Sequence, residues 1–569
     1  GEGIFKSVGT VDVLAHELPE TAQSTSGIAH TRWATHGLPT KGNAHPHHGP
    51  ERRVWLVHNG IIENYKELKR DLQDEGDAFV SETDSEVLAY LIEGELAHAD
   101  SLEEAVTRAL QMVRGTFGIA VMDAAEPETI IAARMGSPIA LGLGNEENLV
   151  ASDASAIVRH TKHVVYLNDG EYAVVRPDSF QVFTLDHKKQ DPAQYVIEWD
   201  IEDVKKQGYP HFMLKEIMEG PEVIRNTLRG RLNPAEGDVK LGGIESVAEE
   251  LREVERLVIV ACGTAYYAGL YGKYLIEELS GIHVDVEIAS EFRYQNTNLS
   301  GKTAVLAVTQ SGETADTLAC IKEAKKNGTL TLGIVNVVGS TIARESDAGI
   351  YNHAGPEIGV ASTKAYLSQL AVFVLLGLYF GRRRGLSQAE GLRLINDLAR
   401  IPDHLETVLA QSEAIKALAR EYADHRDFLF IGRKGNFGTA YEGALKLKEI
   451  SYLHAEGYGA GEMKHGPIAM IDESFPTFAI APQDSVYEKT VSNVEEIKAR
   501  KGPVVAVVTA GDQELSALAD HVIEIPAVTE ELAPILAVVP THLFAYHLGV
   551  ARDYNVDRPR NLAKSVTVE

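Results

Sequence analysis

Downstream of about residue 250, short apolar runs alternate with longer segments of helical periodicity. Apolar runs bounded by polar turns are typical of strands buried on both faces of a sheet. Because helix-length segments separate them, they predict parallel sheets of the doubly wound α/β class. The runs expected to form strands are residues 257–261, 304–308, 331–335, 428–431, 477–480 and 504–508.

The same order of elements occurs twice in this part of the chain. At an offset of 171 residues, the run 257–260 overlies 428–431, and Glu278 overlies Glu449. Residue identity between the halves is low, so the inference rests on the order of elements. We predict a tandem duplication of one α/β unit.

The first 190 residues mix shorter strand and helix patterns. They predict strands at 54–57, 119–122, 130–133 and 164–166 and a helix at 85–97. The polar passage 186–203 is expected to be a connection. The apolar spacing over 210–228 predicts a helix that leads into the next module.

The segment Thr309-Gln310-Ser311-Gly312-Glu313-Thr314 lies where a predicted strand hands over to a helix. Free backbone N–H groups at a helix start, with hydroxyl donors beside them, form a site for phosphate. The loop has neither a lysine nor the GxxxxGK[ST] spacing of nucleotide-binding loops, so it favours a metal-free cradle for a phosphorylated metabolite. From this segment alone, an ordinary polar βα turn remains the alternative.

Size and charge narrow the class of protein. The 569 residues, 44% hydrophobic and 24% charged, predict about three globular domains. A net charge of −28 argues against nucleic-acid or anionic-membrane partners, and fits a halophilic surface as well as a merely soluble protein. The longest apolar run, 370–380, is too short to span a bilayer. The two cysteines, Cys262 and Cys320, exclude a disulfide scaffold and suit a reducing cytoplasm.

Glu442, Lys446 and Glu449 share one face of a predicted helix. A solvated face with salt bridges is the ordinary interpretation of this spacing. The glycine-rich continuation 454–467 favours chemistry instead, since glycines let the backbone turn tightly around Glu, Lys and His side chains. Those residue types can open a sugar ring and move a proton between adjacent carbons. Neither step requires a metal, and the chain has no HExxH pattern, so no cofactor is expected.

The chain ends in a tail that contains Lys564. A terminal segment is ordinarily frayed. Leu562, Val566 and Val568 supply apolar anchors, so the alternative is a docked tail that carries Lys564 into a site. Desolvation there would favour the neutral amine, which forms a Schiff base with a carbonyl substrate.

Several motifs occur together and in order across nearly the whole chain. They are Cys262-Gly263-Thr264, Gln310-Ser311-Gly312-Glu313-Thr314, Glu357-Ile358-Gly359-Val360-Ala361-Ser362-Thr363-Lys364, Lys464-His465-Gly466-Pro467 and the tail 562–569. In this combination the chain resembles the glutamine–fructose-6-phosphate aminotransferases (isomerizing), also called glucosamine-6-phosphate synthases. The resemblance implies an N-terminal-nucleophile-hydrolase-like αββα sandwich of α+β class, followed by two tandem doubly wound sugar-isomerase (SIS) domains.

The resemblance also implies the order of domains and the partners. We expect a glutaminase-type domain over 1–190, a linker and connecting helix over 191–245, SIS domains over 246–390 and 391–550, and an active-site tail over 551–569. The implied substrates are fructose 6-phosphate and glutamine, or ammonia, bound by at least a homodimer. No cofactor, nucleic acid or membrane is implied.

On the sugar side, the resemblance implies Glu449 as the proton-shuttling base with Lys446 beside it, and His465 as the ring-opening group. Lys564 is the amine expected to form the imine. The residues expected to bind the sugar phosphate are Thr264, Thr309, Gln310, Ser311, Thr314, Ala361 and Ser362. Ala265 departs from the family pattern, which often has a hydroxyl there, so one hydrogen bond is missing or made by water.

The N-terminal third resembles the glutaminase of the family at residues 30–37, 58–60 and 81–84. The residues expected to bind glutamine are Arg32, Thr35, His36, Asn59, Gly60 and Asp84. An arginine can clamp the α-carboxylate bidentately, a carboxylate can receive the α-ammonium, and an amide pair can stabilise a tetrahedral oxyanion. Trp33 is either a gate on an ammonia passage, as in the family, or a core tryptophan.

The family nucleophile is an N-terminal cysteine, whereas this sequence starts with Gly1 and has no cysteine before Cys262. Either the sequence is an incomplete version of a normal synthase, or the protein is a variant that depends on free ammonia. Incompleteness is favoured, because Arg32, Asn59 and Asp84 would otherwise have no purpose.

The expected function is therefore transfer of the amide nitrogen of glutamine to fructose 6-phosphate, with isomerisation to glucosamine 6-phosphate, the first step of amino-sugar synthesis. A sugar-phosphate isomerase without amination and a non-catalytic sugar-phosphate sensor are the alternatives. The presence of Glu449, His465 and Lys564 argues against the sensor.

Overall fold

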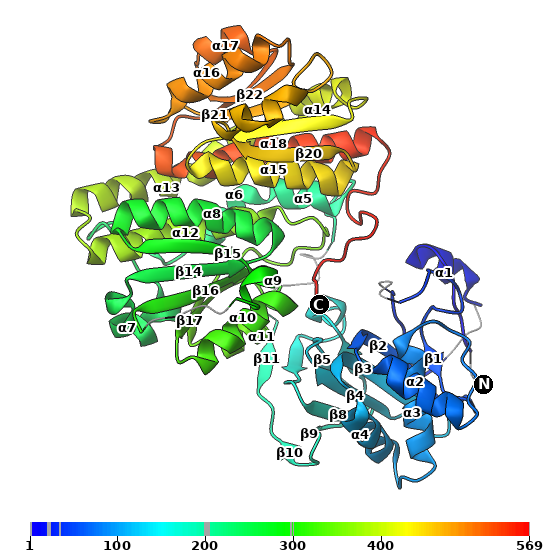
Figure 1. The fold of residues 1–569 in the computed structure, drawn as a ribbon. Coiled ribbons are helices and arrows are strands. Elements are labelled where there is room, and N and C mark those ends of the chain that lie inside the picture. Colours follow the sequence, from blue (N-terminus) through cyan, green and yellow to red (C-terminus); the bar gives the residue numbers. More distant parts are fainter. Residues whose placement is uncertain are drawn as a thin grey trace. The chain divides into compact units, whose positions relative to one another are not determined.

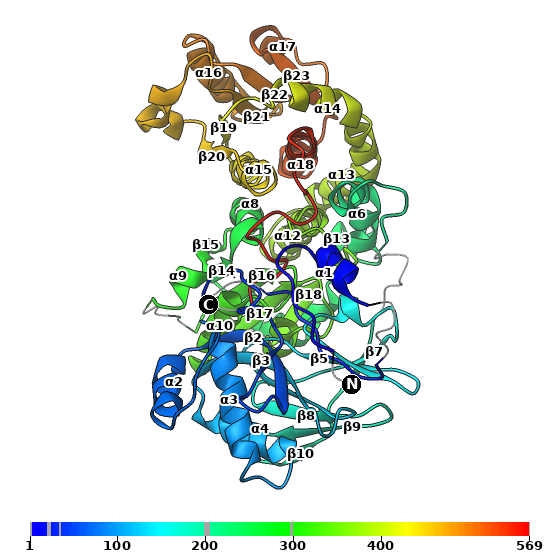
Figure 2. The same cartoon turned by 90° about the vertical axis from the view of Figure 1, so that its right-hand side faces the viewer.

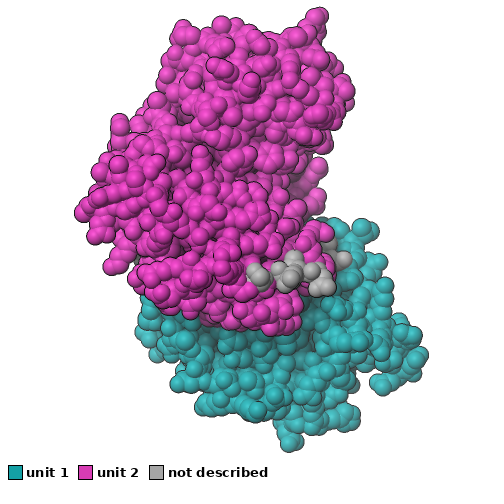
Figure 3. Space-filling view, turned by 60° about the vertical axis from the view of Figure 1, so that its left-hand side comes forward, with its two compact units in different colours: residues 1–201, 313–315, 565–569 teal, residues 202–312, 316–564 magenta. Residues whose placement is uncertain are grey.

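The computed structural model describes residues 3–19, 24–32, 36–197, 205–295, 299 and 301–567. The chain divides into two compact units, coloured separately in Figure 3. Unit 1 comprises residues 1–201, 313–315 and 565–569, and unit 2 comprises residues 202–312 and 316–564.

Unit 1 contains two antiparallel sheets (Figure 1). The larger has the order β1-β2-β3-β4-β8-β9-β10 and the smaller the order β11-β7-β5-β6. The strands are β1 (His47–His48), β2 (Val54–Ile62), β3 (Gly115–Asp123), β4 (Ile130–Met135), β5 (Ala140–Leu143), β6 (Asn148–Ala151), β7 (His163–Tyr166), β8 (Glu171–Val175), β9 (Phe180–Thr184), β10 (Lys189–Gln190) and β11 (Gln194–Val196).

Helices cover one face of the larger sheet and the smaller sheet covers the other. Leu88 and Ile92 of α3 join one core with Val54 and Leu56 of β2, while Ala132 joins a second core on the opposite face. The helices of this unit are α1 (Val11–Glu17), α2 (Tyr65–Asp74), α3 (Asp84–Leu96), α4 (Leu102–Met112) and the 3-10 helix η1 (Ala154–Ala156). The side chains of Thr83 and Ser101 cap α3 and α4 by accepting backbone hydrogen bonds.

Unit 2 contains two five-stranded parallel sheets with the same strand order, β15-β14-β16-β17-β18 and β20-β19-β21-β22-β23. The predicted duplication and the doubly wound α/β class are thus confirmed. The first sheet has β14 (Arg256–Ala261), β15 (His283–Ile288), β16 (Thr303–Thr309), β17 (Leu330–Val335) and β18 (Ala348–Tyr351). The second has β19 (Asp427–Gly432), β20 (His454–Gly459), β21 (Thr477–Ala481), β22 (Val504–Thr509) and β23 (His521–Ile525).

Four long helices pack between these two sheets, and Figure 2 views several of them nearly end-on. They are α8 (Gly263–Ser280), α12 (Lys364–Arg383), α15 (Gly435–Ser451) and α18 (Ala533–Ala551). Alternate residues of β14 face opposite layers: Leu257 and Ile259 join the core between the sheets, and Val258 and Val260 join the outer one.

The remaining elements of unit 2 connect the sheets or cover their outer faces. They are α5 (Phe212–Met218), α6 (Gly220–Leu228), β12 (Leu232–Asn233), β13 (Asp238–Val239), η2 (Gly242–Val247), α7 (Ala248–Glu253), α9 (Ala289–Phe292), α10 (Ala315–Lys326), α11 (Thr341–Glu345), α13 (Gln388–Leu409), α14 (Ser412–Glu421), η3 (Glu462–His465), η4 (Pro467–Met470), α16 (Tyr487–Lys498), α17 (Glu514–Leu518) and η5 (Glu530–Leu532).

Two of the helices in the described part of the chain are long and apolar enough to cross a membrane. They are Lys364–Arg383 and Glu530–Ala551, whose apolar windows are 100% and 94% buried inside the protein. The apolar run 370–380 is therefore part of a 20-residue helix. Its uniform hydrophobicity reflects burial on all sides between the two sheets.

Several expectations for individual segments are wrong. Part of the expected connection 186–203 forms β10 and β11, and the expected helix 210–228 is two helices, with Pro221 in the first turn of the second. The glycine-rich stretch at 454–459 is not a tight turn, because His454–Gly459 is the strand β20, paired with β19.

Candidate active site

The expected phosphate loop joins β16 to α10 at the carboxyl edge of the first parallel sheet, where α/β proteins bind ligands. Gly312 has a φ of 70°, and a Cβ there would lie 1.9 Å from Ser340 Oγ, so the turn accepts only glycine. The Gly312 amide donates to Thr309 Oγ1 (3.3 Å), and its carbonyl accepts from the Ile342 amide (2.9 Å). The backbone is thus fixed in a tight turn, with the Gly312 amide engaged inside the loop.

Lys446, on α15 of the second module, reaches Thr264 at the start of α8 in the first. Its Nζ donates to Thr264 Oγ1 at 3.0 Å and forms ion pairs with Glu449 Oε2 (2.5 Å) and Glu442 Oε1 (3.5 Å). Lys446 and Glu442 are fully buried, so the solvated-face interpretation is wrong. Burial alone would lower the pKa of Lys446, but the carboxylates of Glu442 and Glu449 outweigh it and raise that pKa. The raised pKa favours the ammonium form of Lys446, which is suited to stabilise negative charge.

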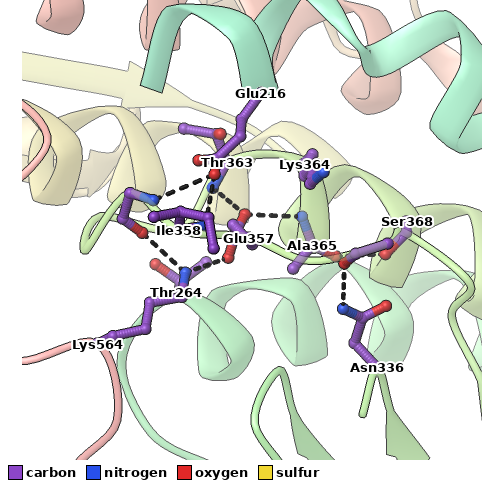
Figure 4. Close-up of polar contacts among 12 residues, drawn as sticks. Glu216, Thr264, Asn336, Glu357, Ile358, Thr363, Lys364, Ala365, Ser368 and Lys564 are labelled. Carbon is purple, nitrogen blue, oxygen red and sulfur yellow. Dashed lines mark hydrogen bonds and ion pairs between the residues drawn. The ribbon is translucent and has the colours of Figure 1, made fainter. Parts of the chain in front are cut away.

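Lys564 is docked rather than frayed. Its Nζ donates to Glu357 Oε2 at 2.5 Å and to the Gly359 carbonyl at 2.9 Å (Figure 4). Glu357 is buried and also accepts the amides of Thr363 (2.8 Å) and Ala365 (3.0 Å). Burial alone would raise the pKa of Glu357, but the Lys564 ammonium and these amides lower it to about 2. Glu357 also raises the pKa of Lys446, so one carboxylate acts on both amines.

The tail is held by different groups from those expected. Leu562 and Val566 are 41% and 45% exposed, so they are not its anchors, and Val568 lies outside the described residues. Asp557 instead accepts the amides of Phe212 (3.0 Å) and Met213 (2.9 Å) at the start of α5. A polar cap on a helix N-terminus thus fixes the segment that leads to Lys564.

The other expected sugar-side residues divide into two groups. Ala361 is buried and Ser362 half-buried in the β18–α12 connection, the same connection that carries Glu357. His465 is exposed at the end of η3, and the polar partners of Lys446 and Lys564 in the described chain do not include it. The structure therefore does not bring His465 to the two lysines.

In unit 1, the expected oxyanion residues lie at the end of β2. Asn59 Oδ1 is 2.7 Å from His30 Nε2. Gly60 has a φ of 139°, and a Cβ there would lie 2.1 Å from the Thr116 carbonyl oxygen. Asp84 is buried at the start of α3, where its Oδ2 accepts the Ile62 amide at 2.8 Å.

Arg32 and His36 lie near Asp84. His36 Nδ1 is 3.9 Å from Asp84 Oδ1, and burial lowers the pKa of Arg32 although the Asp84 charge opposes this. The Arg32 guanidinium donates to the carbonyls of His36, Gly37 and Leu38, so it holds its own loop. The expected residues Trp33 and Thr35 lie outside the described part of the chain.

The sequence reasoning missed several residues of the sugar side. Glu357 lies in one of the motifs but has no expected role, although a carboxylate inside an apolar connection itself indicates a functional residue. No local pattern marks Glu216, Asp557 or His542, because their contacts come from segments distant in sequence. Among the described residues, no group of three or more His, Cys, Asp and Glu could hold a metal ion.

The two units together define a glutamine amidotransferase domain joined to two sugar-isomerase domains. Residues 19–188 match the family model "Glutamine amidotransferase domain", and residues 250–379 and 421–552 match "SIS domain". The chain is 51% identical to the glutamine–fructose-6-phosphate aminotransferase (isomerizing) of Chlorobaculum tepidum, over 96% of this chain and 89% of that protein. It is 48% identical to the protein of the same name from Thermus thermophilus, over 100% of this chain and 93% of that protein. The chain belongs to the glutamine–fructose-6-phosphate aminotransferase (isomerizing) family.

Solved structures agree with this assignment. The C-terminal domain of glucosamine-fructose-6-phosphate aminotransferase from Francisella tularensis aligns with a TM-score of 0.60 and 35% identity, over 62% of this chain and all of that chain. A tagatose-6-phosphate ketose/aldose isomerase from Escherichia coli aligns with a TM-score of 0.50 and 16% identity, over 62% of this chain and 96% of that one, which shows the fold alone.

Proposed function

We propose that this enzyme transfers the amide nitrogen of glutamine to fructose 6-phosphate and isomerises the product to glucosamine 6-phosphate. The observation that carries the proposal is a pair of amines, the half-buried Lys564 on Glu357 and the buried Lys446 on Glu449, at the edge of the sheet that holds the 309–314 loop. An amine, a carboxylate base and a phosphate-type loop are the groups that imine formation and isomerisation of a ketose phosphate require.

In the proposed reaction, the Lys564 ammonium first loses a proton to solvent, the neutral Nζ attacks the C2 carbonyl carbon of fructose 6-phosphate, and an imine forms with loss of water. Ammonia then replaces the lysine nitrogen at C2. Glu449 moves a proton from C1 to C2, which leaves an aldehyde at C1 and an amino group at C2. Lys446, held as an ammonium by two carboxylates, stabilises the negative charge that develops on the substrate oxygen.

The phosphate is assigned to Thr264, Thr309, Gln310, Ser311 and Thr314, with Ala361 and Ser362 completing the sugar site. Glutamine is assigned to Arg32, Thr35, His36, Asn59, Gly60 and Asp84, with Trp33 as the ammonia gate. Gly60 supports this assignment. It has a positive φ and no side chain that could cover its own backbone amide beside Asn59.

We extend the proposal to the domain boundaries 1–190, 191–245, 246–390, 391–550 and 551–569, and to a homodimer. The exposed position of His465 supports the dimer, since a second copy could supply this ring-opening group to the site. Both cysteines are free, which supports a cytoplasmic location.

The test uses the natively expressed protein with its N-terminal residue determined by mass. Fructose 6-phosphate and borohydride should label Lys564, because hydride adds to the imine carbon and a proton to nitrogen. Glutamine should support formation of glucosamine 6-phosphate. Product with ammonia but none with glutamine would remove the glutaminase half, and conversion to glucose 6-phosphate that Lys564→Ala leaves unchanged would indicate an isomerase without amination.

A further inference from the structure

Helix α5 contacts both segments that hold the Lys564 amine. We propose that Glu216 of α5 is a positioning residue for this amine and acts through the backbone amides of Ile358 and Gly359. The inference rests on the proposed imine chemistry of Lys564.

The contacts form a short chain from α5 to the amine. Glu216 is 1% exposed, and its Oε1 accepts the amides of Ile358 (2.5 Å) and Gly359 (3.1 Å). The carbonyl of Gly359 accepts from Lys564 Nζ at 2.9 Å, and Glu357, one residue before Ile358, holds the same nitrogen (Figure 4). Both acceptors of the amine thus belong to a loop whose amides are tied to one buried carboxyl group.

The second Glu216 oxygen leaves no room for this loop to move closer. Oε2 is buried and has no hydrogen-bond partner among the residues that the structure describes, and a Cβ on Gly359 would lie 2.8 Å from it. Glycine at 359 therefore permits the close approach of loop and carboxyl group.

Burial and one neighbouring carboxylate favour the neutral form of Glu216, although Lys564 and Lys364 oppose the shift. Burial, and then the Glu357 carboxylate, raise the pKa of Glu216 to about 7. The neighbouring cation Lys364 is engaged by Glu219 at 2.7 Å. When Glu216 is protonated, the negative charge paired with the Lys564 ammonium is that of Glu357.

The same helix fixes the other segment. Asp557 caps the amides of Phe212 and Met213 at the start of α5, and its carbonyl accepts the Val360 amide at 3.0 Å. Helix α5 therefore holds both the loop that carries Glu357 and the tail, and Glu216 is the residue of α5 that contacts this loop.

The experiment measures borohydride trapping of fructose 6-phosphate on Lys564 in the full chain. Glutamine at 216 keeps a carbonyl acceptor for both amides and is neutral, so Glu216→Gln should trap within about twofold of wild type. Leucine keeps the volume and removes the acceptor, so Glu216→Leu should trap about 10- to 100-fold more slowly. The KM for fructose 6-phosphate should change less than the trapping rate, because the 309–314 loop is untouched, although Ala361 and Ser362 lie in the connection that Glu216 holds.

Glu222→Gln, on exposed Glu222 of the next helix, is the matched control and should trap like wild type. Trapping by Glu216→Leu at the wild-type rate would overturn the inference, and so would equal losses in the Leu and Gln variants, since they would make the charge the requirement. If Glu216→Leu does not fold, Glu216→Asp, which withdraws the carboxyl from the amides, should show the loss. Absence of Lys564 labelling in wild type would instead reject the proposed function.

Discussion

Lys446 is a fully buried cation between two carboxylates, so its charge affects the free energy of unfolding as well as the proposed reaction. Lys446→Met leaves Glu442 buried with His542 Nε2, at 3.2 Å, as its one partner in the described part of the chain. Removing one member of a buried ion pair costs about 3–5 kcal/mol, because the remaining charge is uncompensated. The free energy of unfolding, measured with urea, should fall by about that amount.

Two further variants test this explanation of the Lys446 effect. The double variant Glu442→Gln/Lys446→Met should recover part of the loss, since it removes the stranded charge. Lys448→Met changes an exposed lysine of the same helix and should alter stability by less than about 0.5 kcal/mol. A double variant no more stable than Lys446→Met would contradict the charge explanation.

Glu216 and Glu357 shift stability in opposite directions with pH. The pKa of Glu357 falls to about 2 through Lys564 and two amides, so its contribution is present above 4.5 and is lost as pH drops toward 2. The pKa of Glu216 rises to about 7 through burial and Glu357, so the folded state holds a proton that the unfolded state releases above 4.5. Its contribution is present below 4.5 and is lost as pH rises toward 7.

The measurement is the free energy of unfolding from pH 4.5 to 7 in wild type and in Glu216→Gln. The groups that act on Glu216 are Glu357, Lys564 and Lys364, and all three remain in the variant. Relative to the variant, wild type should lose up to about 3 kcal/mol across this range. Parallel curves would show that Glu216 ionises normally.

At the scale of elements, the tail and α5 depend on each other. Asp557→Ala removes the acceptor of two amides at the start of α5 and leaves Lys206, 3.7 Å away, without this carboxylate. Loss of a helix cap costs about 1–2 kcal/mol, and here it also releases the segment before Lys564. Imine trapping should fall about tenfold, and amide hydrogen exchange should increase at Phe212 and Met213.

Asp424→Ala, at an exposed aspartate ahead of β19, provides the comparison and should change neither quantity. Unchanged hydrogen exchange in α5 after Asp557→Ala would show that the tail docks without the cap.

Elements with continuous apolar runs were predictable, and elements at sheet edges were not. The central strands β14, β16, β19 and β21 match the predicted runs within one or two residues at most ends. The edge strands β15, β18, β20 and β23 are only partly buried and carry polar residues, so they lack that signal. The site shows the same division: Lys446, Glu449 and Lys564 lie in motifs, whereas Glu216 and Asp557 act through contacts between residues more than 100 positions apart.

At the scale of the whole molecule, the two repeats of unit 2 differ, among many positions, at the residue that begins α8 in the first repeat. Lys434 stands 171 residues after Gly263, and both have positive φ, 48° and 54°. In the second repeat this lysine donates to Ser485 Oγ (2.9 Å) and to Glu530, so it is engaged in an ion pair at a position where the first repeat has a glycine. The second repeat instead supplies Lys446 and Glu449 to the first.

Because the second repeat supplies Lys446 to the first, the sugar chemistry requires the contact between α8 and α15. Gly438 of α15 lies against α8, and a Cβ there would be 2.6 Å from the Tyr267 carbonyl oxygen. Backbone at that distance cannot yield without moving the helices apart, so Gly438→Ala should lengthen the Lys446–Thr264 contact.

Ammonia-dependent formation of glucosamine 6-phosphate by Gly438→Ala should fall at least about tenfold, even though alanine is the better helix former by about 1 kcal/mol. Gly94→Ala in α3, where a Cβ would meet no described atom within 4 Å, isolates the helix-propensity gain and should keep full activity. Full activity in Gly438→Ala would mean that the two repeats tolerate separation and that Lys446 acts without its contact to Thr264.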